Sequence, residues 1–591
     1  MIIRFRSKDG VFRVQADSST KFADLIKQVY PKLAPGVNLD SIKVSSDSKH
    51  TDEINVRAYH DKTAAELGLE NGAMLFLTYG STATGSGKNP SSATTSKTTS
   101  IGTSMNGKLE NISMTTVPIN STKTFSRQLE IDDELDKDKG LIKRKKTPLC
   151  RHNDRGMCEY CSPLPPWDKS YQQEHNIKHT SFHAYVDEVN AQINKEESLS
   201  SYITPLHESN FEIDRHCTNG HEPWPKGICS KCQPSAISLQ IQKFRMVDHL
   251  EFQDSEIVNN FINAWRLSGT QRVGIMFGSY ARYDKVPLGT KAKVQAIYEL
   301  PQVDREDGIM LQKWEDEDKV IKLAAEMNLV PVGIIFTDLI DAGKGDGSVI
   351  CKRHKSSFFL SSLELVFAVK WQLKFPNICR WSSSGKFSSK FVTCVISGNP
   401  SGEIDMEAYQ ASESAEGLVK ADLISPSTHP SQVFVNEQND KRYVPDIMYN
   451  MVNEYGLEVK KNGKPTFPVE YLLVSLTHGF PEKSSPFFKD TEKFPIENRN
   501  YIDEVPTMSD IKEHFNIPDD PAVFVSRLSN FHLLNYILDN LQVLGAKDRE
   551  LILKIVQELG NGDLEKSKTD AYALLESPGW KSLKMIVDMG Y

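Results

Sequence analysis

The sequence predicts a multidomain α+β protein in which two small modules rich in cysteine and histidine separate an N-terminal domain from larger mixed domains. Three observations support this prediction. The chain has 591 residues, which at roughly 150 residues per domain corresponds to about four domains. Strand-like alternation and helical periodicity both occur, in different segments of the chain. Six of the nine cysteines fall into two short clusters.

The composition supports folded domains and argues against several classes of protein. Hydrophobic residues make up 39% of the chain and charged residues 25%, which is enough apolar material for real cores. Lys and Arg number 70 against 78 Asp and Glu, for a net charge of −8, so nucleic-acid binding along the whole chain is not expected. We find no apolar run of about 18 residues and no signal-like start. The sequence therefore predicts no membrane span and a reducing compartment.

Residues 1–80 have the element order of a β-grasp domain. Residues 2–6 and 11–14 alternate around a turn, as in a β-hairpin. A late strand is expected over 74–79. Four apolar residues between them recur at helical spacing: Phe22, Leu25, Ile26 and Val29. The stretch resembles ubiquitin-like and UBX-like domains, although residues 43–60 lack the Phe-Pro-Arg loop that UBX domains insert into their partner.

Residues 81–145 are predicted to be a flexible linker. Residues 81–125 are mostly Ser, Thr, Gly and Asn, which cannot bury enough apolar surface to offset chain entropy. An acidic run over 130–138 and a basic run over 143–146 follow. We expect this charged segment to be solvated. A nuclear-import patch and a locally packed segment are the alternatives.

Two clusters in residues 146–240 carry the strongest chemical signal. Each combines three thiols with one imidazole, and two residues separate its last two cysteines, so both sulfurs can reach one ion in a tetrahedral shell. Four protein ligands close that shell, which predicts two structural zinc ions without a catalytic role. A redox pair of cysteines would not need the upstream Cys and His. The predicted ligands are Cys150, His152, Cys158 and Cys161, and Cys217, His221, Cys229 and Cys232.

Other histidines and cysteines are weaker candidates. His216 adjoins Cys217 and is the rival of His221, but its side chain is expected to point away from the cluster. Four histidines between the clusters are expected to be surface or structural residues, because no Glu-rich zinc-helix motif accompanies them: His175, His179, His183 and His207. The remaining three cysteines are expected to pack as small hydrophobes: Cys351, Cys379 and Cys394.

The segments around the two clusters resemble the nuclear protein localization protein 4 family. Residues 150–167 are similar to the first zinc motif of that family and residues 217–235 to the second, and Phe244-Arg-Met-Val-Asp-His249 follows as it does in the family. The resemblance covers essentially the whole chain and is weakest in the linker. No cysteine follows Cys394, which indicates the fungal type without the C-terminal ubiquitin-binding zinc finger.

Residues 241–420 alternate strands with helices and resemble the MPN domain of JAMM metalloproteases; some other α/β domain is the alternative. Strands are expected over 273–277, 292–300, 330–336 and 391–397, and helices over 251–267 and 360–373. Residues 421–591 are predicted to form a mixed C-terminal domain that begins with strands and ends in helices with apolar stripes.

The resemblance to JAMM metalloproteases also identifies a degenerate active site. In those enzymes a His-x-His pair binds catalytic zinc, and a Ser-x-x-Asp motif follows on the next helix. Here Phe336 and Asp338 stand at the histidine positions, Ser361 is retained, and Glu364 takes the Asp position. Phenylalanine cannot bind a metal ion, so the resemblance implies an inactive MPN domain and a protein that is not an enzyme.

The family resemblance implies a non-enzymatic adaptor. As a heterodimer with ubiquitin fusion degradation protein 1, it would deliver polyubiquitinated proteins to the hexameric Cdc48/valosin-containing-protein AAA+ ATPase and present an unfolded ubiquitin to the pore. The implied processes are proteasomal degradation, extraction from the endoplasmic reticulum, and protein and mRNA transport. The implied location is the cytoplasm and nucleus, with peripheral association with the endoplasmic reticulum and nuclear envelope through partners.

Three other functions stay open on the residues alone. An active JAMM-type deubiquitinating metalloprotease would need a metal site that the His-x-His positions do not supply. A zinc-dependent nucleic-acid-binding protein would need more positive charge than this chain carries. A structural scaffold without ubiquitin affinity would show the same sequence patterns. The residues that would contact ubiquitin are not assigned.

Overall fold

Two units make up the chain, residues 1–115 and 116–591, and each is built around a β-sheet. The computed structural model describes residues 2–7, 10–17, 20–30, 42–45, 54–55, 62–63, 66–67, 73–78, 127–153, 156–194, 202–541 and 543–589. The low-complexity stretch 81–125 lies outside the described residues. No helix in the described ranges is long and apolar enough to cross a bilayer.

In its described residues, the N-terminal unit is a mixed five-stranded sheet covered by one helix. The sheet order is β2-β1-β5-β3-β4, with β1 (Ile2–Ser7), β2 (Gly10–Gln15), β3 (Lys43–Ser45), β4 (Ile54–Asn55) and β5 (Met74–Thr78). β1 and β5 run parallel, with Phe5 opposite Leu75. Helix α1 (Phe22–Val29) buries the four predicted apolar residues in this unit's core. The predicted hairpin, helix and late strand are confirmed in a β-grasp arrangement.

A closed barrel forms the centre of the larger unit, with strand order β10-β11-β9-β22-β16-β15-β14. Its strands are β9 (His249–Phe252), β10 (Val273–Tyr283), β11 (Gly289–Glu299), β14 (Val330–Asp338), β15 (Val392–Gly398), β16 (Ile404–Ala411) and β22 (Leu473–Gly479). β14 is antiparallel to β10 and parallel to β15, so that Phe336 lies opposite both Val273 and Val395. Seven of its nine residues are buried, as expected for a strand covered on both faces.

Helices α5 to α8 accompany the barrel: α5 (Ser255–Ser268), α6 (Glu317–Glu326), α7 (Ser362–Lys374) and α8 (Glu413–Lys420). The predicted start of α5 at residue 251 is wrong by four residues. Asp254 caps the helix by accepting a hydrogen bond from the Glu256 backbone N–H, and the residues before it pair in the barrel as β9. The helix ends at Gly269, whose φ of 73° is left-handed. The four strands predicted over 273–397 and the helix predicted over 360–373 are confirmed.

The predicted domain boundary at residue 420 cuts through the barrel sheet and needs correction. β22 lies between β16 and β9, with Leu476 opposite Ala408 and Thr477 opposite His249. The chain between β16 and β22 contributes to two small sheets. One consists of β17 (Ile424–Pro426), β18 (Gln432–Val435) and β21 (Thr466–Pro468), and in the other β20 (Glu458–Asn462) and β19 (Ile447–Val452) are joined by β7 (Ile237–Leu239), from earlier in the chain. The barrel is therefore completed by the segment that was predicted to begin the C-terminal domain.

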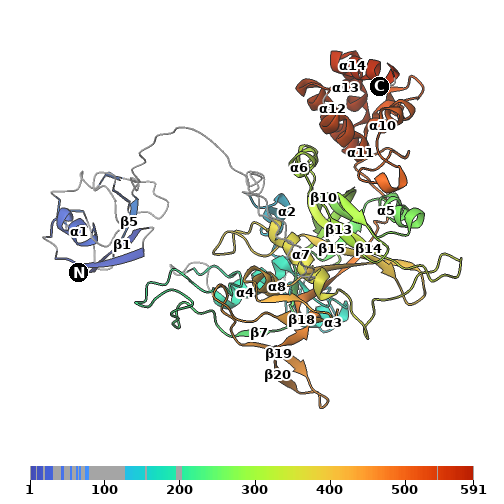
Figure 1. The fold of residues 1–591 in the computed structure, drawn as a ribbon. Coiled ribbons are helices and arrows are strands. Elements are labelled where there is room, and N and C mark those ends of the chain that lie inside the picture. The colour runs from blue at the N-terminus through green and yellow to red at the C-terminus, as the bar shows by residue number, and fades with distance from the viewer. Residues whose placement is uncertain are drawn as a thin grey trace, which may run out of the picture. The chain divides into compact units, whose positions relative to one another are not determined.

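The C-terminal end is helical, as predicted. Its helices, which gather in one cluster in Figure 1, are α9 (Met508–His514), α10 (Pro521–Leu528), α11 (Phe531–Asn535), α12 (Ala546–Gly560), α13 (Leu564–Glu576) and α14 (Pro578–Met589). The apolar stripe predicted in α12 is largely buried: Leu551 is partly buried, and the other members, Ile552, Ile555, Val556 and Leu559, are at most 7% exposed. Their core is continuous with the barrel core, where the rings of Phe277 and Phe531 lie 5.5 Å apart.

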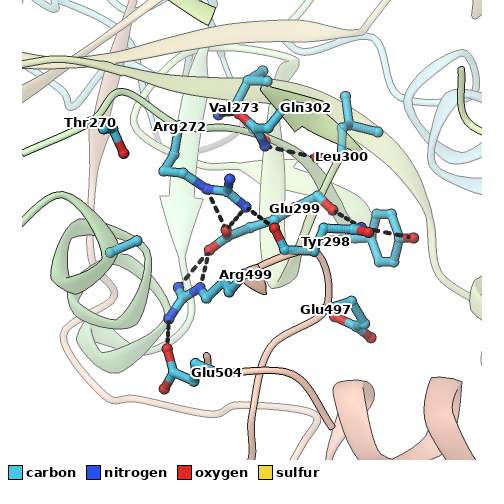
Figure 2. A network of polar contacts seen from close by, with 12 residues as sticks. Thr270, Arg272, Val273, Tyr298, Glu299, Leu300, Gln302, Glu497, Arg499 and Glu504 are labelled. Carbon is cyan, nitrogen blue, oxygen red and sulfur yellow. Dashed lines mark hydrogen bonds and ion pairs between the residues drawn. The ribbon is translucent and has the colours of Figure 1, made fainter. Parts of the chain in front are cut away.

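A buried polar network also joins the barrel to the segment that leads into these helices (Figure 2). The Glu299 carboxylate, at the end of β11, accepts hydrogen bonds from Arg272 Nε at 2.7 Å and Arg499 Nε at 3.0 Å. Arg499 also donates to Glu504 at 2.7 Å and to the Asn260 carbonyl at 2.8 Å. Arg272 and Glu299 are at most 1% exposed. We call this group the Glu299 clasp.

The first part of the larger unit contains short elements that precede the barrel: α2 (Glu130–Leu135), α3 (Lys169–Glu174), β6 (Thr180–Ser181), α4 (Phe182–Ile193) and β8 (Phe244–Arg245). α2 falls inside the predicted linker 81–145, so that boundary needs correction as well. Leu135 is fully buried, as is the carboxylate-bearing Asp132 at 2% exposure. Residues 127–146 are therefore a packed segment of the larger unit.

Candidate metal centres and the pocket at Asp338

The first cysteine cluster has the dimensions of a tetrahedral zinc site. The ligand atoms of Cys150, His152, Cys158 and Cys161 all lie within 4.8 Å of one another. Cys158 Sγ is 3.7 Å from Cys150 Sγ and 3.8 Å from Cys161 Sγ. Zinc–sulfur bonds of about 2.3 Å in a tetrahedral shell separate two sulfurs by about 3.8 Å. The donor set and its spacing therefore fit zinc.

Hydrogen bonds around this cluster orient the imidazole of His152 and lower the pKa of Cys150. His152 Nδ1–H donates to the Asn153 carbonyl at 2.8 Å, which leaves Nε2 to face the cluster, as in zinc-bound histidines. The backbone N–H of Thr147 is the main cause that lowers the pKa of Cys150 to about 6. A lowered pKa favours the thiolate, which is the form that binds metal.

The second cluster repeats this design. The ligand atoms of Cys217, His221, Cys229 and Cys232 again lie within 4.8 Å of one another, and His216 is not among them. Cys217 Sγ lies 3.7 Å from Cys229 Sγ, and His221 Nδ1–H donates to the Glu222 carbonyl at 2.7 Å. The backbone N–H of Lys231 is the main cause that lowers the pKa of Cys229 to about 6.

Gly227 lies so close to the backbone of Glu222 and the ring of His221 that no side chain fits there. A Cβ atom at this position would lie 2.4 Å from the Glu222 carbonyl oxygen and 2.9 Å from His221 Nδ1. Both atoms belong to the hydrogen bond that orients the histidine. A larger residue at Gly227 would therefore displace a predicted ligand.

Arg144 supports the first cluster and was missed by sequence reasoning. Its Nε donates to the Ser162 carbonyl at 2.7 Å, and its Nη2 donates to the Glu159 carbonyl. These carbonyls flank the turn that holds Cys161. The basic run was expected to be solvated; here one of its residues binds the zinc module directly.

The acidic run is the second part of residues 127–146 that contacts the rest of the larger unit. His183 Nε2 lies 3.0 Å from Asp132 Oδ1, and His183 Nδ1 lies 3.0 Å from Asp136 Oδ1. Burial alone would lower the pKa of His183, but its hydrogen bonds to the two carboxylates raise it. Burial alone would raise the pKa of Asp132, but Lys390 and His183 lower it to about 2. We call residues 127–146, held by these contacts, the strap.

The histidines between the clusters each have a protein contact. His183 anchors the strap, and His179 and His207 hydrogen-bond to the Gln242 carbonyl and the Ser383 hydroxyl, each at 3.0 Å. His175 stacks on the ring of Tyr171 at 3.9 Å. Within the described ranges, none of them joins a group of Cys, His, Asp or Glu side chains close enough to share an ion.

The four predicted degenerate protease positions lie in one group of side chains around Arg353, at the end of β14 and the start of α7; we call this group the pocket at Asp338. Phe336 and Asp338 come from the end of β14. Ser361 caps α7, and its hydroxyl accepts from the Glu364 backbone N–H at 3.2 Å while the Glu364 carboxylate accepts from the Ser361 N–H at 2.8 Å. This capping box fixes the start of α7 and holds the Glu364 carboxylate beside the Ser361 backbone.

Arg353, which sequence reasoning did not single out, fills the space between the two carboxylates. It donates to Asp338 Oδ2 from Nε at 3.0 Å and from Nη2 at 2.7 Å. It donates to Glu364 from Nη1 at 2.9 Å and from Nη2 at 2.6 Å. Burial alone would raise the pKa of Asp338, but Arg353 and Lys352 lower it. The run Lys352-Arg353-His354 gives no sign of this role in the sequence, since charged runs are usually solvated.

Sequence comparisons with known proteins cover the whole chain. Models of the NPL4 family match residues 272–588 for the family itself, 126–269 for its zinc-binding region, and 1–78 for a region described as nuclear pore localisation protein NPL4. Among solved structures, a β-grasp-fold-like domain of a hypothetical protein from Arabidopsis thaliana covers 15% of this chain and 91% of its own at 22% identity. Its TM-score of 0.12 is too low to establish a shared fold.

Curated yeast relatives match from end to end. Nuclear protein localization protein 4 of Scheffersomyces stipitis is 48% identical over 99% of both chains. The Candida glabrata protein of that name is 48% identical over 100% of both chains, and the Saccharomyces cerevisiae protein is 47% identical over 99% of both. Since the family models and these relatives together span the barrel, the clusters and the N-terminal unit, the chain belongs to the NPL4 family.

Proposed function

We propose that this chain is a non-enzymatic adaptor that recruits polyubiquitinated proteins to a hexameric AAA+ ATPase, Cdc48/valosin-containing protein, as a heterodimer with ubiquitin fusion degradation protein 1. The main support for the proposal is the end-to-end match to the NPL4 family at 44–48% identity. The cysteine motifs at residues 150–167 and 217–235 resemble the same family. The ATPase would supply the energy of unfolding. The adaptor would act in the cytoplasm and nucleus and reach the endoplasmic reticulum and nuclear envelope through its partners.

Two structural zinc ions complete the proposed adaptor. Cys150, His152, Cys158 and Cys161 would hold one ion, and Cys217, His221, Cys229 and Cys232 the other. Each ion would cross-link a small module that has almost no hydrophobic core. Cys161 in the first module and Cys232 in the second are buried, but few other side chains are. Metal binding supplies folding energy in such modules. Because each shell has four protein ligands, neither ion would have an open position for substrate.

We infer further that the barrel with α7 is an inactive MPN domain. The convergence of Phe336, Asp338, Ser361 and Glu364 on one pocket supports this assignment, because these residues come from a strand end and the next helix start, where the protease ligands would stand. Phe336 is 6% exposed and packs in the core. No side chain of this set offers the histidine pair that a catalytic zinc would need.

The proposed domain division follows from these features. Residues 1–80 form a ubiquitin-like domain, and the linker ends near residue 126, where the strap begins. The strap and both zinc modules extend to residue 240. The inactive MPN domain runs from 241 and includes β22, and the C-terminal helices follow.

A binding and cleavage assay with the purified full chain tests the proposal. Immobilised chain, alone and with its heterodimer partner, is incubated with polyubiquitin and with the hexameric ATPase. We expect retention of both and no release of free ubiquitin over the assay. Ubiquitin release that a metal chelator abolishes would support a deubiquitinase instead, and failure to retain polyubiquitin with the partner present would leave only a scaffold.

A further inference from the structure

The guanidinium of Arg353 is the most completely coordinated cation in this pocket. All five of its N–H donors are used: two on Asp338, two on Glu364, and one on the Phe359 carbonyl at 2.7 Å. The side chain is 2% exposed. Its central carbon lies 5.9 Å from the ring centre of Phe336 and 5.2 Å from that of Phe358. Carboxylates and aromatic faces, the groups that attract a cation, thus surround it.

The charges of the pocket balance without a metal ion. Asp338 and Glu364 contribute two negative charges, and their side chains are only 20% and 23% exposed. Arg353 contributes one positive charge, and Lys352 contributes a second by pairing with Asp338. A divalent metal ion would supply the same total charge from outside the chain. Paired carboxylates that are largely withdrawn from water require such a counter-charge.

We propose that Arg353 is the built-in cation of this pocket, which takes the charge-balancing place of a divalent metal ion between β14 and α7. This proposal rests on the inactive-MPN assignment for the comparison with a metal ion, whereas the contacts of Arg353 stand by themselves. The pocket is consequently a cation-binding site that the Arg353 guanidinium itself occupies. It has the chemistry to take a small planar cation when the Arg353 side chain is removed.

The built-in cation also fastens the segment between β14 and α7. Arg353 lies within that segment, and its contact with the Phe359 carbonyl joins the segment to the start of α7. The Ile350 N–H donates to the Ile340 carbonyl at 2.9 Å, and the Val349 N–H donates to the Gly402 carbonyl at 2.9 Å. Arg353 therefore links β14, the connecting segment and α7 through one side chain.

One consequence concerns attempts to restore catalysis. Changing Phe336 and Asp338 to histidine would supply two imidazoles but leave the guanidinium in place, where its positive charge would repel an incoming zinc ion. The double change should therefore bind no third zinc ion, whereas adding Arg353→Ala to it should allow uptake. Zinc uptake only after Arg353 is removed would show that the cation blocks the pocket. Uptake by the double change alone would show that the pocket merely lacks ligands.

Chemical rescue of Arg353→Ala in the full chain tests the proposal. Removal of the side chain leaves paired carboxylates without a partner, and we expect a fall in Tm of about 5–10 °C. Methylguanidinium chloride at millimolar concentration should recover part of that loss in Arg353→Ala and leave the unmodified chain unchanged. Arg305→Ala, at an exposed position, is the matched control and should neither lose stability nor respond.

A second variant keeps the test decisive when Arg353→Ala does not fold. Arg353→Met combined with Asp338→Asn and Glu364→Gln removes the cation and both charges, and should melt several degrees above Arg353→Met alone. Equal melting of these two variants, or equal stabilisation of the unmodified chain and Arg353→Ala by methylguanidinium, would overturn the proposal. These readouts involve neither ubiquitin nor the ATPase, so their failure is distinguishable from failure of the proposed adaptor function.

Discussion

The two cysteine clusters and the pocket at Asp338 bring anionic groups together in opposite ways. In the clusters, the ligand atoms of three cysteines and one histidine lie within 4.8 Å of one another, and a bound zinc ion would balance the charge of the thiolates. In the pocket, Arg353 and Lys352 balance two carboxylates from within the chain. An external ion can be removed by a chelator, and a side chain cannot. We therefore expect the clusters to depend on a metal ion and the pocket at Asp338 to be independent of one.

The largest expected effect is loss of the first zinc module in Cys158→Ser. Structural zinc contributes on the order of 10 kcal/mol to folding of such modules, so residues around 150–161 should unfold locally. Elemental analysis should find one zinc ion per chain in place of two, and limited proteolysis should cut the module. Cys351→Ser, a half-buried cysteine outside both clusters, is the control and should retain both ions. Two ions in Cys158→Ser would remove the basis of the comparison.

Glu299→Gln should have the next largest effect, because it leaves two buried arginines of the Glu299 clasp without their shared carboxylate (Figure 2). Breaking one partner of a buried ion pair costs about 3–5 kcal/mol, measured here by urea unfolding. Glu504→Gln, at a side chain 37% exposed, should cost less than about 1 kcal/mol. Since the positive charge beside Glu299 comes from Arg272 and Arg499, a chelator should change neither result.

A smaller loss is expected for Asp338→Asn. The amide keeps the shape of the carboxylate but weakens two charge-assisted hydrogen bonds from Arg353, at about 2 kcal/mol. Thermal unfolding in the presence and absence of a chelator measures it, and the two losses should be equal. Asp346→Asn, on an exposed loop residue between β14 and α7, should cost less than about 0.5 kcal/mol. A loss that appears only without chelator would place a metal ion in the pocket.

The smallest effect concerns the pH dependence of the strap. The folded-state pKa of His183 is raised, so its contribution is full below the ordinary histidine pKa and is lost as pH rises through the raised value. The pKa of Asp132 is lowered to about 2, so its contribution is lost only as pH falls toward that value. Hydrogen exchange of residues 130–136, corrected for intrinsic rates, should show less protection at pH 8.5 than at pH 6.

Neighbouring groups that titrate make a control necessary for that measurement. Burial raises the pKa of Asp187 to about 6 and that of Asp248 to about 7. Lys390 pairs with Asp132, and Arg380 with Asp136. In His183→Gln the strap should be less protected at pH 6 and should show little further change at pH 8.5. An unchanged pH dependence in that variant would assign the effect to the neighbouring carboxylates.

The two cysteine clusters could be predicted because their ligands are close together in the sequence. The roles of Asp132, Arg353 and β22 could not, because their partners are far away in the sequence. The ligand spacing of Cys158 and Cys161 is visible in four consecutive residues. The burial of Asp132 depends on His183 and Lys390, which lie 51 and 258 residues away, so its acidic run was expected to be solvated. Arg353 follows the same rule, because its carboxylate partners come from a strand and a helix on either side. Strands were predicted at the start of residues 421–591, but nothing local in the sequence shows that β22 pairs with β16 and β9 in the barrel.

The position of β22 in the barrel sets the order in which the chain can fold as it is synthesised. β9 pairs with β22, and the hydrogen bond between His249 and Thr477 spans 228 residues. At a synthesis rate of about 5–20 residues per second, the ribosome needs on the order of ten seconds or more to supply the second strand after the first. Throughout that interval β9 and β16 expose unpaired edges that can pair with other chains. Truncation before residue 473 would remove β22 and leave the edges of β9 and β16 without the strand that lies between them.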